Sequence, residues 1–348
     1  MNFAQEIIAW YLINKRDLPW RETQDPYIIW LSEIIMQQTR VEQGMPYFNR
    51  FAENYPTVSD FASASEDEIL NLWQGLGYYS RGRNMHQTAR MVMEEHAGYF
   101  PRKYDELLKL KGVGEYTAAA ISSFSANEAK AVVDGNVFRL LSRYFGIDTP
   151  INSSAGKKIF SNLANEVMNK QQAGIYNQAA MEFGSLQCKP VKPPCTICPL
   201  QSSCIAYTSN LVHLLPVKIK PKKVRERYFN FILAMKDGRV LMQKREGKDI
   251  WLNLYQLPLF ETESPIDPVK LLQDAGFTDS FGSDAKIINV SAPVKHLLSH
   301  QRLHARFIQI SDFNDPRAIS SDLFYANANE LKTLAQPKLI FEFLEKFL

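Results

Sequence analysis

The sequence predicts a multidomain protein with an all-α domain over residues 1–212, a linker over residues 213–227 and an α+β domain over residues 228–348. Three observations support this division. The first part follows helical periodicity between Pro and Gly turns, four cysteines crowd into residues 188–204, and the pattern changes to a period of two after Tyr228. A chain of 348 residues, 45% of them hydrophobic, is long enough to bury a core in each domain.

Apolar residues at helical spacing predict the elements of the first part. Residues 1–10 begin an amphipathic helix, and residues 27–44 form a strongly apolar helix. Helices over residues 106–111 and 115–123 flank a Gly-Val-Gly turn, and a further helix over residues 134–146 begins at Asp134. The cysteine loop ends this all-α part.

Alternating apolar residues predict strands in the second part. Residues 228–245 (YFNFILAMKDGRVLMQKR) indicate two strands joined at Asp237–Gly238, which is a hairpin signal. Residues 304–310 predict another strand, and helices follow near residues 268–275 and 329–347. This mixture makes the second domain α+β.

Composition and charge predict an intracellular protein. A net charge of +3 permits a polyanionic partner without requiring one. The chain has no run of about 18 apolar residues, and residues 1–10 lack the basic segment and cleavage site of a secretory signal. We therefore expect a cytoplasmic protein that does not bind membranes. The basic run over residues 218–227 indicates a solvated linker, although it could contact phosphate or act as a localisation signal.

All the cysteines of the chain lie in one short Pro-rich stretch. They are Cys188, Cys195, Cys198 and Cys204. Two disulfides are one interpretation, but the thiols of an intracellular protein stay reduced. A structural zinc is a second interpretation, although only Cys195 and Cys198 form the C-x-x-C pair that zinc ribbons repeat. The spacing favours an iron–sulfur cube over zinc.

The Gly112–Val113–Gly114 turn between two helices is the second strong signal. Its glycines can adopt positive φ and expose backbone N–H groups, and the N-terminus of the second helix points the same way. Such a helix–hairpin–helix can hold a DNA phosphate without reading sequence. A tight turn between core helices is the alternative.

Several segments together resemble one family. They are LPWR (18–21), SEIIMQQTRV (32–41), GLGYYSRGRN (75–84), KGVGEYTAAAI (111–121), VVDGNVFRL (132–140) and the cysteine array. The chain resembles the helix–hairpin–helix DNA glycosylases with an iron–sulfur cluster, the endonuclease III superfamily, and within it the MutY family of adenine DNA glycosylases. The resemblance covers nearly the whole chain.

This resemblance implies a fold, a substrate and a cofactor. It implies a monomer with a helix–hairpin–helix glycosylase domain, a [4Fe-4S] cluster on the four cysteines and a Nudix-like C-terminal domain. The expected partner is double-stranded DNA in which adenine stands opposite 8-oxoguanine or guanine. The expected reaction is hydrolytic removal of that adenine in base excision repair, at the nucleoid if the protein is bacterial.

Two carboxylates suit this chemistry, because the leaving base must be protonated and the sugar cation must be stabilised. Glu33 lies in an apolar run, where burial should raise its pKa, although it could instead face solvent. Asp134 precedes a helix, where its simplest role is an N-cap. The resemblance implies that Glu33 protonates adenine N7 and later activates water, and that Asp134 stabilises or attacks the sugar cation.

Tyr116 and Asn136 are implied by the resemblance to position the aspartate. Relatives that also cleave the strand carry a lysine where this chain has Tyr116, because an amine is needed for a Schiff base. Phe138 also offers no amine, and the family motif does not place Lys111 in the pocket. We therefore expect a monofunctional glycosylase without intrinsic lyase activity.

The remaining DNA contacts are also carried over from the family. Gln38, Thr39, Leu76 and Tyr78 match the residues that fill the duplex after base flipping, although Tyr78 could be an ordinary core aromatic. Trp20 and Arg21 match the wall of the adenine pocket, and Gln178 matches a residue that contacts the base edge. We also expect the cysteine loop to direct basic residues such as Lys189 and Lys192 toward phosphate.

The second domain lacks the acidic Mg²⁺-binding box of active Nudix hydrolases. Only Asp249, Glu261 and Glu263 fall in the relevant stretch, in the wrong pattern. The family reads 8-oxoguanine through a Phe-Ser-His motif, which here is Leu298 followed by Ser299 and His300. We expect these two polar residues to bind the lesion, with weaker packing from the leucine. A plain polar turn is the alternative.

Three other functions remain open from sequence. They are a bifunctional enzyme of the endonuclease III type, a non-catalytic DNA-binding module with a structural metal, and a nucleotide hydrolase. The tyrosine at position 116, the paired carboxylates and the missing acidic box argue against them in turn.

Overall fold

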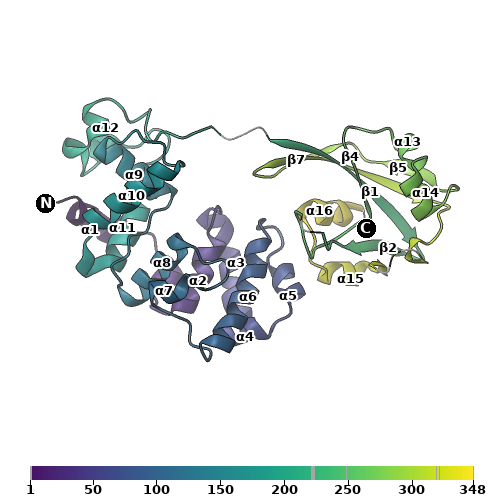
Figure 1. Ribbon diagram of the computed structural model, residues 1–348, viewed down its shortest axis with the longest axis horizontal. Helices are drawn as coiled ribbons and strands as arrows, with labels where there is room; N and C mark the ends of the chain where they lie inside the picture. Colours follow the sequence, from purple (N-terminus) through teal and green to yellow (C-terminus); the bar gives the residue numbers. More distant parts are fainter. Residues whose placement is uncertain (1, 221–223, 248, 319, 321, 348) are drawn as a thin grey trace. The chain divides into compact units, whose positions relative to one another are not determined.

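A computed structural model describes residues 2–220, 224–247, 249–318, 320 and 322–347. Its contacts divide the chain into two compact units. The first contains Met1–Ser63 and Asn84–Pro221, and the second contains Ala64–Arg83 and Lys222–Leu348. Figure 1 colours the helices of the first unit from purple to teal and the sheet of the second unit green. In the part of the chain so described, no helix is long and apolar enough to cross a membrane.

The first unit is built from helices, as predicted (Figure 1). Its four-residue and longer helices are α1 (Phe3–Asn14), α2 (Pro26–Ile35), α3 (Val41–Asn54), α4 (Val58–Ser63), most of α6 (Ser80–Glu95), α7 (Tyr104–Leu107), α8 (Glu115–Ala126), α9 (Gly135–Phe145), α10 (Ser154–Val167), α11 (Ala173–Leu186) and α12 (Ile205–Thr208). Short 3-10 turns lie at Pro19–Arg21, Lys170–Gln172, Cys195–Ile197 and Gln201–Ser203.

Helix α11 is central to this unit, because it packs against α1, α8 and α9. Glycines near its two ends allow close approach of backbones. A Cβ on Gly174 would lie 2.6 Å from the carbonyl oxygen of Ser123 in α8, and a Cβ on Gly184 would lie 2.7 Å from that of Asn136 in α9. The positions of α8 and α9 therefore depend on the absence of side chains at these two sites.

The helix predicted over residues 27–44 is wrong in its second half. Helix α2 ends at Ile35, and Gln38 adopts a φ of 56°, which reverses the chain before α3 begins at Val41. The apolar periodicity continued through the break because Met36 still packs inward. A Cβ on Gly44 would lie 2.5 Å from the Met36 sulfur. A short turn therefore separates α2 from α3, and the apolar pattern of the sequence did not predict it.

The hairpin is present, with a shorter first helix than predicted. Helix α7 ends at Leu107, and turns lead to Gly112, whose φ is 74°. A Cβ on Gly112 would lie 2.8 Å from the Asn84 side chain in α6. The buried Thr88 hydroxyl, also in α6, donates a 2.5 Å hydrogen bond to the Lys111 carbonyl. Helix α6 therefore braces the hairpin from behind.

The second unit contains a mixed sheet of eight strands in the order β3-β2-β1-β7-β5, with β4 paired to β1, β6 to β7 and β8 to β2. Its strands are β1 (Arg225–Lys236), β2 (Arg239–Lys244), β3 (Tyr255–Gln256), β4 (Leu259–Thr262), β5 (Lys286–Val290), β6 (Val294–Leu297), β7 (Gln301–Ser311) and β8 (Leu323–Ala326). The predicted β1–β2 hairpin is confirmed, because Asp237 and Gly238 both have positive φ, as its two-residue turn requires.

Helices cover both faces of this sheet. Strand β1 runs parallel to β7 from Arg225 opposite Gln301 to Ala234 opposite Ile310. Its residues Ile232 and Ala234 join a core with Phe277 and Phe281 of α14 (Ala275–Phe281). On β7, Phe307 stacks at 3.7 Å on Phe343 of α16 (Lys338–Phe347). Burial on both sides explains the nearly continuous apolar run in β1. The remaining helices are α13 (Pro268–Leu272) and α15 (Ala328–Thr333).

Residues 64–83 belong to the second unit although the chain leaves and re-enters the first around them. They include α5 (Glu66–Leu72) and the start of α6. Asp67 receives hydrogen bonds from Lys244 at 3.2 Å and from Tyr255 at 2.8 Å, and the Tyr79 hydroxyl donates to the Gln336 carbonyl at 3.0 Å. The sequence places this segment within residues 1–212, and the domain boundaries expected there stay predictions.

Candidate active site

A cleft of about 680 Å³ opens in the first unit. The turn after α2, the N-terminus of α9 and one face of α11 contribute to its walls. It brings together many of the residues singled out in the sequence: Trp20, Arg21, Glu33, Gln38, Thr39, Tyr116, Asp134 and Asn136. Glu33 and Asp134, which are far apart in the sequence, therefore share one cavity.

Glu33 is a buried carboxyl with one hydrogen bond from a side chain. Helix α2 begins at Pro26 after an Asp25 cap and buries almost all of its residues. The side chain of Glu33 extends into the cleft, and the hydroxyl of Tyr116 in α8 donates to its Oε2 at 2.7 Å. Burial raises the pKa of Glu33 to about 7, since the Tyr116 hydrogen bond offsets only part of that effect and the charge of Asp134 adds to it. Glu33 can thus hold a proton near neutral pH.

Asp134 is the N-cap of α9. Its Oδ1 accepts from the backbone N–H groups of Asn136 at 2.9 Å and Val137 at 2.8 Å, and its Oδ2 accepts from Asn136 Nδ2 at 2.7 Å. Burial raises the pKa of Asp134, and these hydrogen bonds limit the rise. Glu33 and Asp134 therefore lie in different environments within one cleft, an arrangement that separates an acid from a carboxylate.

Tyr116 remains a phenol that can only donate toward Glu33 when that residue is ionised. Burial, followed by the charges of Glu33 and Asp134, raises its pKa well above the ordinary value. The hydroxyl bonds to Oε2, so Oε1 of Glu33 receives no hydrogen bond from Tyr116.

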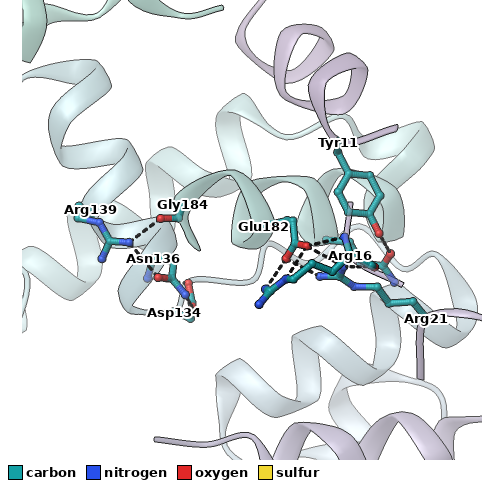
Figure 2. A network of polar contacts seen from close by, with 9 residues as sticks. Tyr11, Arg16, Arg21, Asp134, Asn136, Arg139, Glu182 and Gly184 are labelled. Carbon is teal, nitrogen blue, oxygen red and sulfur yellow. Dashed lines mark hydrogen bonds and ion pairs between the residues drawn. The ribbon is translucent and has the colours of Figure 1, made fainter. Parts of the chain in front are cut away.

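Arg139 connects the residue beside the aspartate to the cysteine loop. Figure 2 shows its bonds to Asn136 and Gly184. Its Nη2 donates to Asn136 Oδ1 at 2.9 Å and to the Gly184 carbonyl at 2.6 Å, while its Nε donates to the Cys188 carbonyl at 2.7 Å. Because the Asn136 oxygen accepts from Arg139, its amide nitrogen must face Asp134. A chain of hydrogen bonds therefore runs from the first cysteine to the cleft.

A second buried network borders the cleft and was missed by the sequence analysis. Glu182 of α11 accepts from Arg16 at 2.7 Å and from Arg21 at 2.8 Å (Figure 2). Burial alone would raise the pKa of Glu182, but the two guanidinium groups lower it to about 2. The available signal was a glutamate in a helix of small and apolar residues, where an unpaired charge is costly. Its partners are too distant in sequence to be deduced.

Other predicted site residues lie outside this cleft. Gln178 is absent from the cleft lining so described, and its Oε1 accepts a 2.6 Å hydrogen bond from Tyr11. The lining of this cleft also does not include the hairpin residues 112–114, the four cysteines, or Ser299 and His300 of the second unit. The cleft alone accounts for the residues expected to surround adenine, with that exception.

The four cysteines are free thiols in a loop with two 3-10 turns. Burial raises the pKa of Cys198 to about 11, and the charges of the other three cysteines act in the same direction. Arg143 supports the loop through the carbonyls of Lys189 at 2.7 Å and Pro190 at 3.1 Å. No disulfide joins these cysteines.

Four cysteine thiols in one loop are a donor set that suits either an iron–sulfur cluster or a zinc ion. Among the described residues, no group of three or more His, Cys, Asp or Glu side chains could hold a single metal ion. Zinc would need its ligands to meet at about 2.3 Å from one centre. A four-iron cube takes one thiolate at each of several iron atoms, so its cysteines stand further apart.

The second unit has a cavity of its own, of about 550 Å³. It includes Leu76 and Tyr78 from the N-terminal segment of this unit together with Leu298, Ser299 and His300 after β6. The hydroxyl groups of Tyr78 and Ser299 are hydrogen-bonded to each other. Residues that the sequence separated into two domains thus line one cavity.

Active Nudix hydrolases carry an acidic Mg²⁺-binding box in the stretch that here contains three carboxylates. Two of these three are already paired with an arginine. Arg227, whose side chain is 4% exposed, contacts Asp249 at 2.7 Å and Glu261 at 2.5 Å. Although burial acts in the opposite direction, the hydrogen bonds from Arg227 lower the pKa of Asp249 to about 2. These carboxylates are neutralised by protein and are poorly placed to hold a metal ion.

Comparisons with known proteins agree with this geometry. Residues 31–166 match the model of the HhH-GPD superfamily of base excision DNA repair proteins, and residues 230–346 match that of the NUDIX domain. The adenine DNA glycosylase of Buchnera aphidicola (subsp. Baizongia pistaciae) is 34% identical over 311 residues, which cover 88% of this chain and 86% of that protein.

The chain belongs to the adenine DNA glycosylase family.

A further member of the family and a solved DNA glycosylase structure are also similar to this chain. The adenine DNA glycosylase of Mus musculus is 42% identical over 214 residues, covering 59% of this chain and 42% of that protein. A solved thermostable thymine-DNA glycosylase matches with a TM-score of 0.55 and 29% identity, over 60% of this chain and 95% of that one. The adenine glycosylase match thus spans both units, whereas this solved structure covers 60% of the chain.

Replacing Gly184 by alanine tests the contact between α11 and α9. The new Cβ would meet the Asn136 backbone at 2.7 Å and its side chain at 2.8 Å, so α9 must shift. We expect a loss of about 1–3 kcal/mol in the free energy of unfolding, typical of overpacking. The measurement is the denaturant midpoint of the 222 nm circular dichroism signal.

Gly247→Ala is the matched control, since a Cβ there meets no atom within 4 Å. Its midpoint should equal that of the unmodified protein. Equal midpoints for both variants would contradict the tight α11–α9 contact.

Proposed function

We propose that this member of the adenine DNA glycosylase family flips and hydrolytically excises adenine paired with 8-oxoguanine or guanine, with no lyase step. One observation carries the proposal: a buried acid with a pKa of about 7, Glu33, shares a cleft with the capped carboxylate of Asp134. The cleft volume of about 680 Å³ is within the range of small-ligand pockets.

The reaction begins with proton transfer from Glu33 to N7 of the flipped adenine. The bond between the sugar and N9 then breaks, and its electron pair leaves with the neutral base. Asp134 stabilises the resulting sugar cation, or attacks it to form a transient adduct. Water adds to the anomeric carbon, and the Glu33 carboxylate takes up its proton, which restores the acid.

Neighbouring residues hold these groups in place. Tyr116 donates to Oε2 of Glu33, and Asn136 donates to Oδ2 of Asp134. Arg21, fixed by Glu182, and Trp20 form the wall of the adenine site. Gln38 and Thr39 occupy the turn after α2, from which they fill the space left by the flipped base. The orientation of Gln178 toward Tyr11 supports a role behind the wall rather than on the base itself.

A monofunctional mechanism is supported by the composition of the cleft. The described residues that line it include the arginines Arg16, Arg21 and Arg40 and no lysine. Arginine stays protonated and does not form a Schiff base under physiological conditions. Tyr116 occupies the position that carries lysine in strand-cleaving relatives. The described lining therefore offers no amine that could form a Schiff base with the sugar.

The cysteine loop is proposed to hold a [4Fe-4S] cluster through Cys188, Cys195, Cys198 and Cys204. When bound, the cluster supplies structural cross-linking of the loop, and no step of hydrolysis transfers an electron. Lys189 and Lys192 in this loop contact DNA phosphates, as do the backbone N–H groups of Gly112, Val113 and Gly114. Double-stranded DNA is thus the partner of a monomer that acts in the cytoplasm, at the nucleoid if bacterial.

The cavity of the second unit is proposed as the 8-oxoguanine site. Ser299 and His300 offer hydrogen bonds to the altered edge of the lesion, and Leu76 and Tyr78 wedge the base stack beside it. Leu298 replaces an aromatic ring and packs less surface. Because Arg227 occupies Asp249 and Glu261, this unit binds without hydrolysing nucleotides.

Glu33→Gln should lower the single-turnover excision of adenine from an A:8-oxoguanine duplex by at least about 100-fold, since general acid catalysis contributes 10²–10⁴. In the unmodified enzyme the acid is protonated below its pKa of about 7. The excision rate should therefore be constant below that pH and fall about tenfold per unit above it. Glu53→Gln, on the exposed side of α3, is the control.

If Glu33→Gln released adenine as fast as the control variant, Glu33 would not be the general acid. A wild-type rate that rises with pH would lead to the same conclusion.

Borohydride should fail to trap this protein on DNA that already contains an abasic site. The positive control is Tyr116→Lys, which places an amine in the cleft and should become covalently linked. Pre-formed abasic DNA removes any need for the variant to excise adenine. Trapping of the wild type as efficient as that of Tyr116→Lys would show that a lysine lies within reach and would favour the bifunctional function.

Elemental analysis should find about four iron atoms per chain and little zinc in protein purified without oxygen. Cys198→Ser should lose most of this iron, because it removes one of the four proposed thiolate ligands. Stoichiometric zinc with no iron in the unmodified protein would overturn the cluster.

A further inference from the structure

The loop that presents Tyr78 has an unusual backbone. Gly75, Gly77 and Tyr78 have φ values of 98°, 74° and 48°. Glycine adopts such angles freely, but a tyrosine in the left-handed region is strained and persists only where its surroundings hold it. Tyr78 is also 44% exposed, so core packing does not hold it. Specific contacts must keep the ring where it meets Ser299.

The backbone beneath Tyr78 is fixed through one carbonyl. The Gly77 oxygen accepts from the indole N–H of Trp73 at 2.9 Å and from Arg81 Nη2 at 3.3 Å. Trp73 is fully buried and gives this carbonyl a rigid partner. The next residue, Tyr79, has its hydroxyl bonded to the Gln336 carbonyl in the same unit. The loop is therefore tied down on both sides of Tyr78.

The ring of Tyr78 is held by Arg81. The guanidinium carbon of Arg81 lies 5.3 Å from the centre of the Tyr78 ring and 5.2 Å from that of Trp73. A planar cation near the faces of two aromatic rings is attracted by both. One arginine thus connects a buried tryptophan, a strained backbone and an exposed tyrosine.

We propose that Arg81 is a positioning residue that holds Tyr78 in its left-handed conformation beside Ser299, and so sets the preference for 8-oxoguanine over guanine. The inference rests on the proposed function, because it assigns a determinant to the same lesion cavity. Arg81 acts through Tyr78 and need not touch DNA.

Burial agrees with an internal role for this arginine. It lowers the pKa of Arg81 to about 10, so the side chain is partly removed from solvent and still charged at neutral pH. An arginine that neutralised a phosphate would instead stand in open solvent and contribute to the salt dependence of DNA binding.

The test is a double-mutant cycle on the discrimination ratio, the single-turnover excision rate for A:8-oxoguanine divided by that for A:G. Arg81→Met keeps length and apolar surface but removes the charge and donors. It should lower the ratio by roughly 5- to 30-fold, the range expected for a desolvated cation–π contact with a hydrogen bond. In a Tyr78→Ala background the same change should alter the ratio less than about twofold.

Arg90→Met is the control, because Arg90 lies on α6 with an exposed ion pair to Glu94. It should keep the wild-type ratio. Arg81→Lys, which keeps the charge but loses the planar fork, should give an intermediate ratio and serves if the methionine variant does not fold.

Three results would overturn the inference. They are an unchanged ratio for Arg81→Met and Arg81→Lys, independent effects of Arg81→Met and Tyr78→Ala that multiply, and a drop of about one in the salt slope of DNA binding for Arg81→Met, which would mark a phosphate contact. A wild-type protein that excises adenine from neither duplex would instead refute the proposed function.

Discussion

The site depends on keeping a proton on a carboxyl that water would remove. Helix α2 buries Glu33 among apolar residues, and Tyr116 supplies one hydrogen bond from a side chain. More donors would stabilise the anion and return the pKa to its ordinary value, as the hydrogen bonds to Asp134 act to do on the other side of the cleft. The scarcity of donors around Glu33 and their abundance around Asp134 give two similar groups different surroundings, and this difference underlies the proposed roles.

Helix α11 connects the cleft to the packing of the rest of the first unit. It carries Glu182, which fixes Arg16 and Arg21 at one wall of the cleft, and Gly184, which lets α9 approach. The Gly184 carbonyl also accepts from Arg139, whose other bonds reach Asn136 and the Cys188 backbone. A change in the position of the cysteine loop would therefore alter the position of Asp134, through the hydrogen bonds of Arg139 and the contact between α11 and α9.

Much of the fold could be predicted from the sequence, because its signals are local. The N-cap at Asp134, the turn at Asp237–Gly238 and the apolar run around Glu33 each determine a neighbouring structure. The break after α2 could not be predicted, since Gln38 carries no signature of a left-handed turn and Met36 continues the apolar pattern. Glu182 was missed for a different reason: its meaning comes from arginines more than 160 residues away. The grouping of residues 64–83 with the second unit likewise rests on long-range bonds such as that of Asp67 to Tyr255.

Arg227 has a consequence for attempts to turn the second unit into a nucleotide-cleaving enzyme. Grafting the missing glutamates alone would add acidic groups beside a guanidinium that already sits between Asp249 and Glu261. Any cation would have to displace that internal counter-ion, whose removal leaves two repelling carboxylates that are only partly exposed to solvent. The arginine thus acts as a built-in substitute for magnesium, and a designer would have to exchange it together with its carboxylates.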